Sequence, residues 1–72
     1  MNTKTPPVIH IKFKCKGRDI SDRVVPLGTP VPSRGDIVSP EEVDRIFRVD
    51  SRGIHYMSNG SIFVMLILTL TK

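Results

Sequence analysis

The feature that most constrains the fold is a strict alternation of apolar and polar side chains near the start of the chain. The odd positions are apolar: Ile9, Ile11, Phe13 and Cys15. The even positions are polar, and three are basic: His10, Lys12, Lys14 and Lys16. A period of two is typical of a half-buried β-strand, because successive side chains point to opposite faces. The sequence therefore predicts a strand over residues 8–16, ended by a turn at Gly17.

The remaining elements are expected to be short. The chain has 72 residues, of which six are proline and five are glycine, so it makes one domain at most. Residues 1–7, with Pro6 and Pro7, are predicted to form a flexible tail, and residues 8–72 a single domain. Further strands are predicted at 23–27, 36–38, 46–50, 54–58 and 61–71. Pro26 removes a ladder donor, which favours an edge position for its strand.

Three turn signals separate these strands. Residues 50–53 end in Gly53 and predict a turn, and Asn59-Gly60 predicts a hairpin of type I′. Ser39-Pro40 followed by Glu42 reads as a capping box, which predicts one helical turn near residues 40–45.

The last predicted strand is apolar on both faces. One face carries Ile62, Val64, Leu66, Leu68 and Leu70, and the other carries Phe63, Met65 and Ile67. An antiparallel strand with one wet face should alternate instead. Either this strand passes through the centre of a closed barrel, or its outer face is covered by another chain. Phe63, Met65 and Ile67 are therefore candidates for a self-association surface, which would make the protein a homo-oligomer.

Five or six short strands with one helical turn predict an all-β protein, a small SH3-like barrel. Three segments carry a resemblance: Pro32-Ser33-Arg34-Gly35-Asp36-Ile37-Val38, Phe47-Arg48-Val49 and Ile62-Phe63-Val64. They resemble short SH3-like β-barrel proteins of bacterial and phage open reading frames, most of which have no assigned activity. The resemblance implies this fold and an origin in a phage or another mobile element.

Positive charge gathers at the start of the chain. Residues 1–18 carry five basic and no acidic residues, whereas residues 19–72 carry six basic and seven acidic ones. Lys12, Lys14 and Lys16 form a stripe with a spacing of about 6.6 Å, which His10 and Arg18 extend. Such a basic face suits an acidic protein partner or a nucleic-acid backbone. It also suits an edge strand that lysines keep from aggregating.

No motif points to catalysis, a metal or a cofactor. A single cysteine and two histidines exclude an internal disulfide and make a zinc site unexpected. His10 and Cys15 are an odd number of positions apart, so they face opposite ways and form no dyad. The acids near residue 42 suit the first turn of a helix, and Arg34-Gly35-Asp36 suits a turn. With no apolar signal core and an apolar run too short to span a membrane, a cytoplasmic location is expected.

These observations predict a non-catalytic binding module, encoded by a phage or mobile element, that docks on a host protein complex through its basic strand face. Inhibition of a nucleic-acid-handling or defence machine falls within this class. Direct binding of nucleic acid by the Lys12, Lys14 and Lys16 stripe is the alternative. A structural phage subunit and a small oligomeric enzyme are two further hypotheses.

Overall fold

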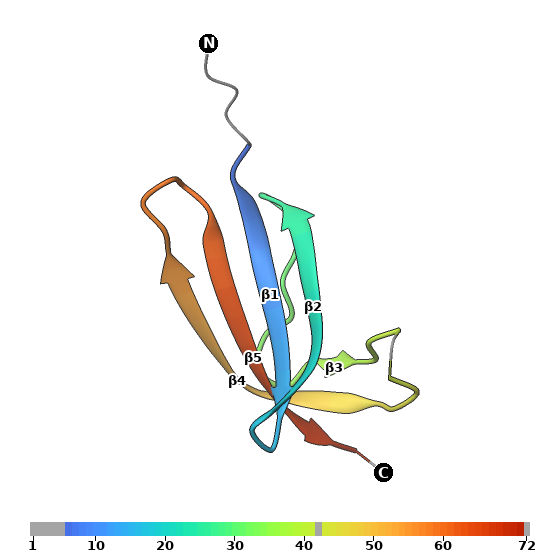
Figure 1. The fold of residues 1–72 in the computed structure, drawn as a ribbon. Helices are drawn as coiled ribbons and strands as arrows, with labels where there is room; N and C mark the ends of the chain where they lie inside the picture. The colour runs from blue at the N-terminus through green and yellow to red at the C-terminus, as the bar shows by residue number, and fades with distance from the viewer. Residues whose placement is uncertain (1–5, 42, 72) are drawn as a thin grey trace.

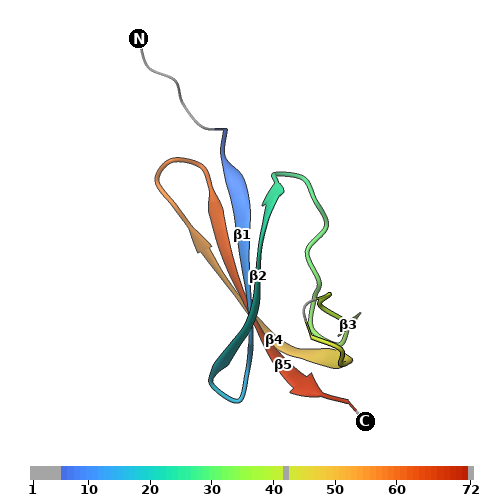
Figure 2. The same cartoon turned by 45° about the vertical axis from the view of Figure 1, so that its right-hand side comes forward.

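The computed structural model describes residues 6–41 and 43–71, and these form a single curled sheet. Its strands are β1 (Val8–Cys15), β2 (Arg18–Pro26), β3 (Ile37–Val38), β4 (Phe47–Tyr56) and β5 (Ile62–Leu70). Their order across the sheet is β2-β1-β5-β4-β3 (Figure 1). All neighbouring pairs are antiparallel except β1 and β5, which run parallel. The sheet does not close, since β2 and β3 are its edges, and the all-β prediction is confirmed as an open half-barrel (Figure 2).

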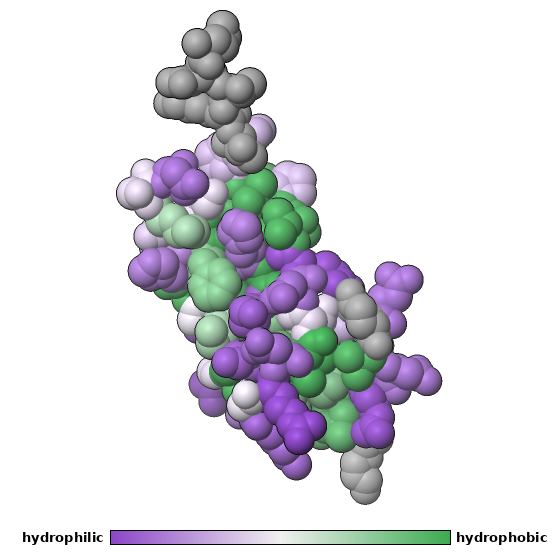
Figure 3. Space-filling model, in the orientation of Figure 1, coloured by the Kyte–Doolittle hydropathy of each residue, from purple (hydrophilic) through white to green (hydrophobic). Residues whose placement is uncertain are grey.

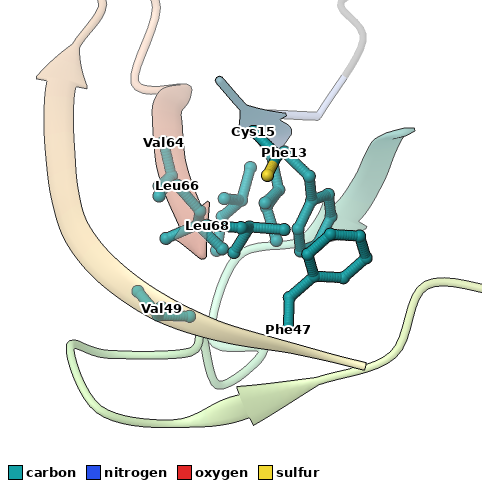
Figure 4. Close-up of a cluster of buried hydrophobic side chains, with 9 residues drawn as sticks. Phe13, Cys15, Phe47, Val49, Val64, Leu66 and Leu68 are labelled. Atoms are coloured by element: carbon teal, nitrogen blue, oxygen red, sulfur yellow. The ribbon is translucent and has the colours of Figure 1, made fainter. Parts of the chain in front are cut away.

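The alternating segment forms β1, and its side chains divide as predicted. Ile9, Ile11, Phe13 and Cys15 are all buried. They join a core that β4 and β5 complete with Phe47, Val49, Val64, Leu66 and Leu68. Figure 4 shows Phe13 and Phe47 pointing into the space that the bent β4 encloses. The connection from β2 to β4 covers this core face, where Val31, Val38 and Val43 pack against the cluster.

The first hairpin is tighter, and its second strand longer, than expected. Lys16 and Gly17 have φ angles of +53° and +77°, and positive φ at both central residues is the mark of a type I′ turn. Lys16 therefore belongs to the turn and not to the strand. β2 begins directly afterwards at Arg18, so the predicted strand at 23–27 was too short; Pro26 ends β2 at a sheet edge, as predicted.

The predicted turn at residues 50–53 is wrong, because β4 runs through this segment without interruption. Val49 pairs with Leu68 and Ser51 with Ile67, so Asp50 is an extra residue that forms a β-bulge. A bulge bends its strand, and Figure 1 shows β4 turning sharply near its middle. Gly53 is absent from the glycines with positive φ and serves no turn.

The hairpin predicted at Asn59-Gly60 is found, but its turn is of a different kind. The amide N–H of Gly60 donates to the Met57 carbonyl (3.1 Å), and that of Met57 donates to the Ser61 carbonyl (2.9 Å). Within this loop, residues 57–61, Gly60 alone has a positive φ, at +92°. This is a three-residue loop closed by a left-handed glycine, in place of the two-residue type I′ turn.

The described residues contain no helix. Where a helical turn was expected, the Val43 N–H donates to the Pro40 carbonyl at 3.1 Å, which closes one turn. The Ser39 hydroxyl donates to the Arg45 carbonyl instead of capping a helix. Glu42 and residues 1–5 of the predicted tail lie outside the described residues. None of the described segments forms a helix long and apolar enough to cross a membrane.

Candidate interaction face

The parallel pairing of β1 with β5 brings two separately predicted sites together. His10 lies beside Phe63, Lys12 beside Met65 and Lys14 beside Ile67. These six side chains project from the face of the sheet that is opposite the core. The residues that alternate with them on both strands are buried on the core side. The candidate basic residues and the candidate self-association residues therefore share one surface, which we call the outer face.

The outer face extends over four strands in three rows, in the order β2, β1, β5, β4. The first row is Val24, His10, Phe63 and His55. The second row is Asp22, Lys12, Met65 and Gly53. The third row is Asp19, Lys14, Ile67 and Ser51. Each row places an apolar side chain of β5 between a polar side chain of β1 and a small or polar residue of β4.

This face is amphipathic and accessible. Val24 is 62% and Ile67 36% exposed, while Phe63 and Met65 are half-buried by their neighbours. In the orientation of Figure 1 the connection after β2 passes behind the sheet, so that the outer face is turned to the viewer. Figure 3 shows hydrophobic and hydrophilic side chains interspersed on it. Neither a purely basic surface nor a purely apolar one is present.

The two lysines of the outer face have carboxylate partners on β2. The Lys12 Nζ lies 3.4 Å from Asp22 Oδ1 and 3.5 Å from Asp19 Oδ2, and the Lys14 Nζ lies 3.6 Å from Asp19 Oδ1. The hydrogen bond with Asp22, and next the charge of Asp19, raise the pKa of Lys12 above its ordinary value of 10.5. Two cations face two anions here, so the local charge cancels.

A β-bulge in β2 brings both carboxylates to these lysines. Phe13 pairs with Ser21 and Lys14 with Asp19, which leaves Ile20 as the extra residue. Asp19 and Asp22 are three positions apart and would face opposite ways in a regular strand. The bulge shifts the phase by one residue, so that both acids reach the outer face while Ile20 packs against the core.

The structure separates the remaining members of the predicted basic face. Lys16 lies at the tip of the first hairpin and is exposed. Arg18 pairs with Cys15, which is buried on the core face, and so it starts β2 on the opposite side from Lys12. Of the five predicted residues, His10, Lys12 and Lys14 share the outer face.

Sequence reasoning missed the acidic column of Asp19 and Asp22, since the bulge in β2 hides the alternation that would have assigned them to a face.

Sequence reasoning also missed a shallow depression of about 630 Å³ beside the bulge of β4, lined by Ser33, Arg34, Asp50, Ser51 and Arg52. The turn at residues 33–36 forms one wall of this depression. It is held by the Gly35 N–H, which donates to the Val49 carbonyl at 2.8 Å, and by the Val49 N–H, which donates to the Asp36 carbonyl at 2.8 Å.

Among residues 6–41 and 43–71, no three His, Cys, Asp or Glu side chains are grouped so that they could hold a metal ion. Comparison of the chain with protein-family models, with curated proteins and with solved structures gives no match. The arrangement of side chains on the sheet is therefore the basis for assigning a function.

Proposed function

We propose that this chain is a non-catalytic module that binds a protein partner with its outer face. The observation that carries the proposal is the apolar column Phe63, Met65 and Ile67, which stands directly beside the ion-paired column of Lys12 and Lys14. An apolar strip with a polar border is the usual anatomy of a protein–protein interface. The ion-paired lysines supply the polar border beside this strip.

The charge balance favours a protein over a nucleic acid. A nucleic-acid backbone is bound by cations that release its counterions, but Asp19 and Asp22 already neutralise Lys12 and Lys14. Binders of single strands also present aromatic rings on which bases stack. Phe63, the only aromatic residue other than histidine in the three rows, is half-buried between its neighbours.

Burial of the apolar column contributes to the free energy of binding but is too small to account for a stable complex alone. Complete burial of one such side chain contributes about 1.5–3 kcal/mol. Since Ile67 is 36% exposed and Phe63 and Met65 are less exposed than that, the three side chains together retain at most roughly 1.5–3 kcal/mol for a partner. Affinity must therefore also come from polar contacts of His10 and the ion-paired column. We assign the partner to a larger protein complex of the cell that harbours a phage or mobile element, a choice supported only by the resemblance of the sequence.

Affinity capture with a tagged chain tests this proposal, using a nuclease-treated extract of the native host. The Met65→Lys variant adds a charge at the centre of the outer face and is expected to lose the proteins that the wild-type chain retains. Ile37→Lys is the matched control, because Ile37 is 61% exposed and lies on β3, at the far edge of the sheet. Equal retention by wild type and Met65→Lys, with circular dichroism showing both folded, would falsify the proposal.

The same variants separate a foreign partner from self-association through the outer face. If a second copy covers Phe63, Met65 and Ile67, light scattering of the purified chain gives a multiple of 8.1 kDa. In that case Met65→Lys lowers the mass and Ile37→Lys does not. The proposal of a foreign partner predicts instead that Met65→Lys leaves the mass of the purified chain unchanged.

A further inference from the structure

β2 and the part of β4 that extends beyond β3 both have a free edge, and the two edges differ in how they are protected. β2 carries a bulge at Ile20, acidic side chains and a terminal Pro26, which are the devices that discourage a second chain from pairing with an edge. β4 is paired by β3 only at Phe47 and Arg48. From Asp50 to Tyr56, no backbone hydrogen bond joins β4 to any described residue outside β5. We call residues 50–56 the open edge; its bulge lies at one end, at Asp50, and the stretch 51–56 contains no proline and one charged residue, Arg52.

Gly53 lies at the centre of the open edge, and the isolated chain gives no reason for it. Its φ is not positive, and a Cβ placed on it would meet no atom within 4 Å. Glycine inside a strand costs about 0.5–1 kcal/mol relative to alanine. With no side chain at position 53, the centre of the open edge offers nothing that would hinder a second strand from pairing there.

When the open edge pairs with a second copy of itself, one register brings an exposed side chain onto the depression beside the bulge. In an antiparallel pair centred on Gly53, Tyr56 of one copy lies opposite the partner's Asp50, and Ile54 lies opposite the partner's Arg52. Tyr56 is 74% exposed and Ile54 44% exposed in the single chain. Asp50 and Arg52 line the shallow depression beside the bulge. Tyr56 thus lies three residues after Gly53, and Asp50, which lines the depression, lies three residues before it.

We propose that two copies of this chain associate by antiparallel pairing of their β4 strands around a two-fold axis at Gly53. Each Tyr56 then enters the depression of the other copy. An interface of this symmetry is self-complementary, because every contact occurs twice. The pairing joins the two sheets into one and leaves the apolar column and the ion-paired column of both outer faces free, so it is independent of the proposed function.

The side chains that meet in this register are compatible. No two groups of like charge stand directly opposite each other. The ring of Tyr56 reaches the diagonal neighbour of its pair, which is the partner's Arg52, and a guanidinium over an aromatic face is attractive. The Tyr56 hydroxyl can donate to the carboxylate of the partner's Asp50, while Ser51 and the partner's His55 form a polar pair.

A disulfide cross-link at the axis tests the register directly. Facing residues of an antiparallel pair have their Cα atoms about 4.5–5.5 Å apart, within the range that a disulfide spans. Gly53→Cys is expected to cross-link with itself on mild oxidation, and a Cβ added at this position meets no atom within 4 Å in the single chain. Val24→Cys, 62% exposed on the protected edge, is the matched control, and buried Cys15 is present in both. Cross-linking of Gly53→Cys no faster than of Val24→Cys would overturn the proposal.

Sedimentation equilibrium provides an independent measurement on the native chain. The wild-type mass is expected to rise from 8.1 kDa towards twice that value with concentration. Tyr56→Ala, which removes an exposed side chain and should leave the fold intact, is expected to weaken association about tenfold or more. Ile67→Lys on the outer face should leave it unchanged. A wild-type mass that stays at 8.1 kDa up to about 1 mM chain, or association lost in Ile67→Lys and kept in Tyr56→Ala, would refute β4 pairing.

Discussion

Replacing both Asp19 and Asp22 by asparagine is expected to turn the outer face from a neutral into a cationic surface. In the wild-type chain these carboxylates lie 3.4–3.6 Å from the ammonium groups of Lys12 and Lys14. Asparagine keeps the size of the side chain and removes the charge, so two positive charges lose their counter-charges. The double variant should therefore bind a nucleic-acid backbone more tightly than the wild-type chain does.

The size of the effect follows from the number of charges released. If two lysines each contact one phosphate of a single strand, the slope of log K against log salt becomes steeper by about 1.4. Between 50 and 200 mM salt this corresponds to a roughly sevenfold fall in affinity. Fluorescence anisotropy of a labelled oligonucleotide, titrated with each chain at several salt concentrations, measures this slope.

The control for this experiment removes the same net charge elsewhere. Glu41→Gln combined with Asp44→Asn alters two exposed residues of the connection between β3 and β4. The wild-type chain and this control should show equally shallow slopes. If the control gains as much affinity as Asp19→Asn with Asp22→Asn, net charge and not the outer face governs binding. If the wild type already shows the steep slope and loses it in Lys12→Glu, the ion pairs do not neutralise the face.

Three further outcomes are expected. Leu66 has no exposed surface, so Leu66→Ala should lower the free energy of unfolding in urea by about 3–5 kcal/mol; a loss below about 1 kcal/mol would show that Leu66 is not at the centre of the core. In dilute samples Gly53→Val should be neutral or mildly stabilising, whereas Gly60→Val should cost about 1 kcal/mol or more, because Gly60 has a φ of +92°; equal thermal midpoints would contradict this. The pKa of Lys12 is raised, so its ion pairs stabilise the fold below pH 10.5 and are lost as pH rises through the higher folded-state value. Nuclear magnetic resonance titration should show that Asp22→Asn lowers the pKa of Lys12. An unchanged pKa would exclude the hydrogen bond between Lys12 and Asp22.

The sequence predicts β1 well because the alternation there is unbroken. From Ile9 to Cys15 every odd position is apolar, and all four of these side chains are buried. The same reasoning misplaced the start of β2 and divided β4 in two. Both failures occur at β-bulges, at Ile20 and Asp50, where one extra residue shifts the phase of the strand. A local pattern of period two has no means of registering such a shift.

The outer face depends on pairing that local sequence does not encode. His10 and Phe63 are separated by most of the chain, yet the parallel ladder places them side by side. The sequence identified both the basic residues and the apolar ones as candidates for binding, and treated them as two surfaces. Only the order of strands shows that they are one, and that Asp22 lies next to Lys12. Long-range register is the information that the amino-acid pattern lacks.

The parallel contact between β1 and β5 is the basis of the outer face, and backbone nuclear Overhauser effects across this strand pair test it most directly. Parallel pairing predicts contacts between Ile9 and Ile62, between Ile11 and Val64 and between Phe13 and Leu66, so that both residue numbers increase together. Contacts in which one number rises while the other falls would show an antiparallel pair. Lys12 would then no longer lie beside Met65, and the outer face as described would not exist.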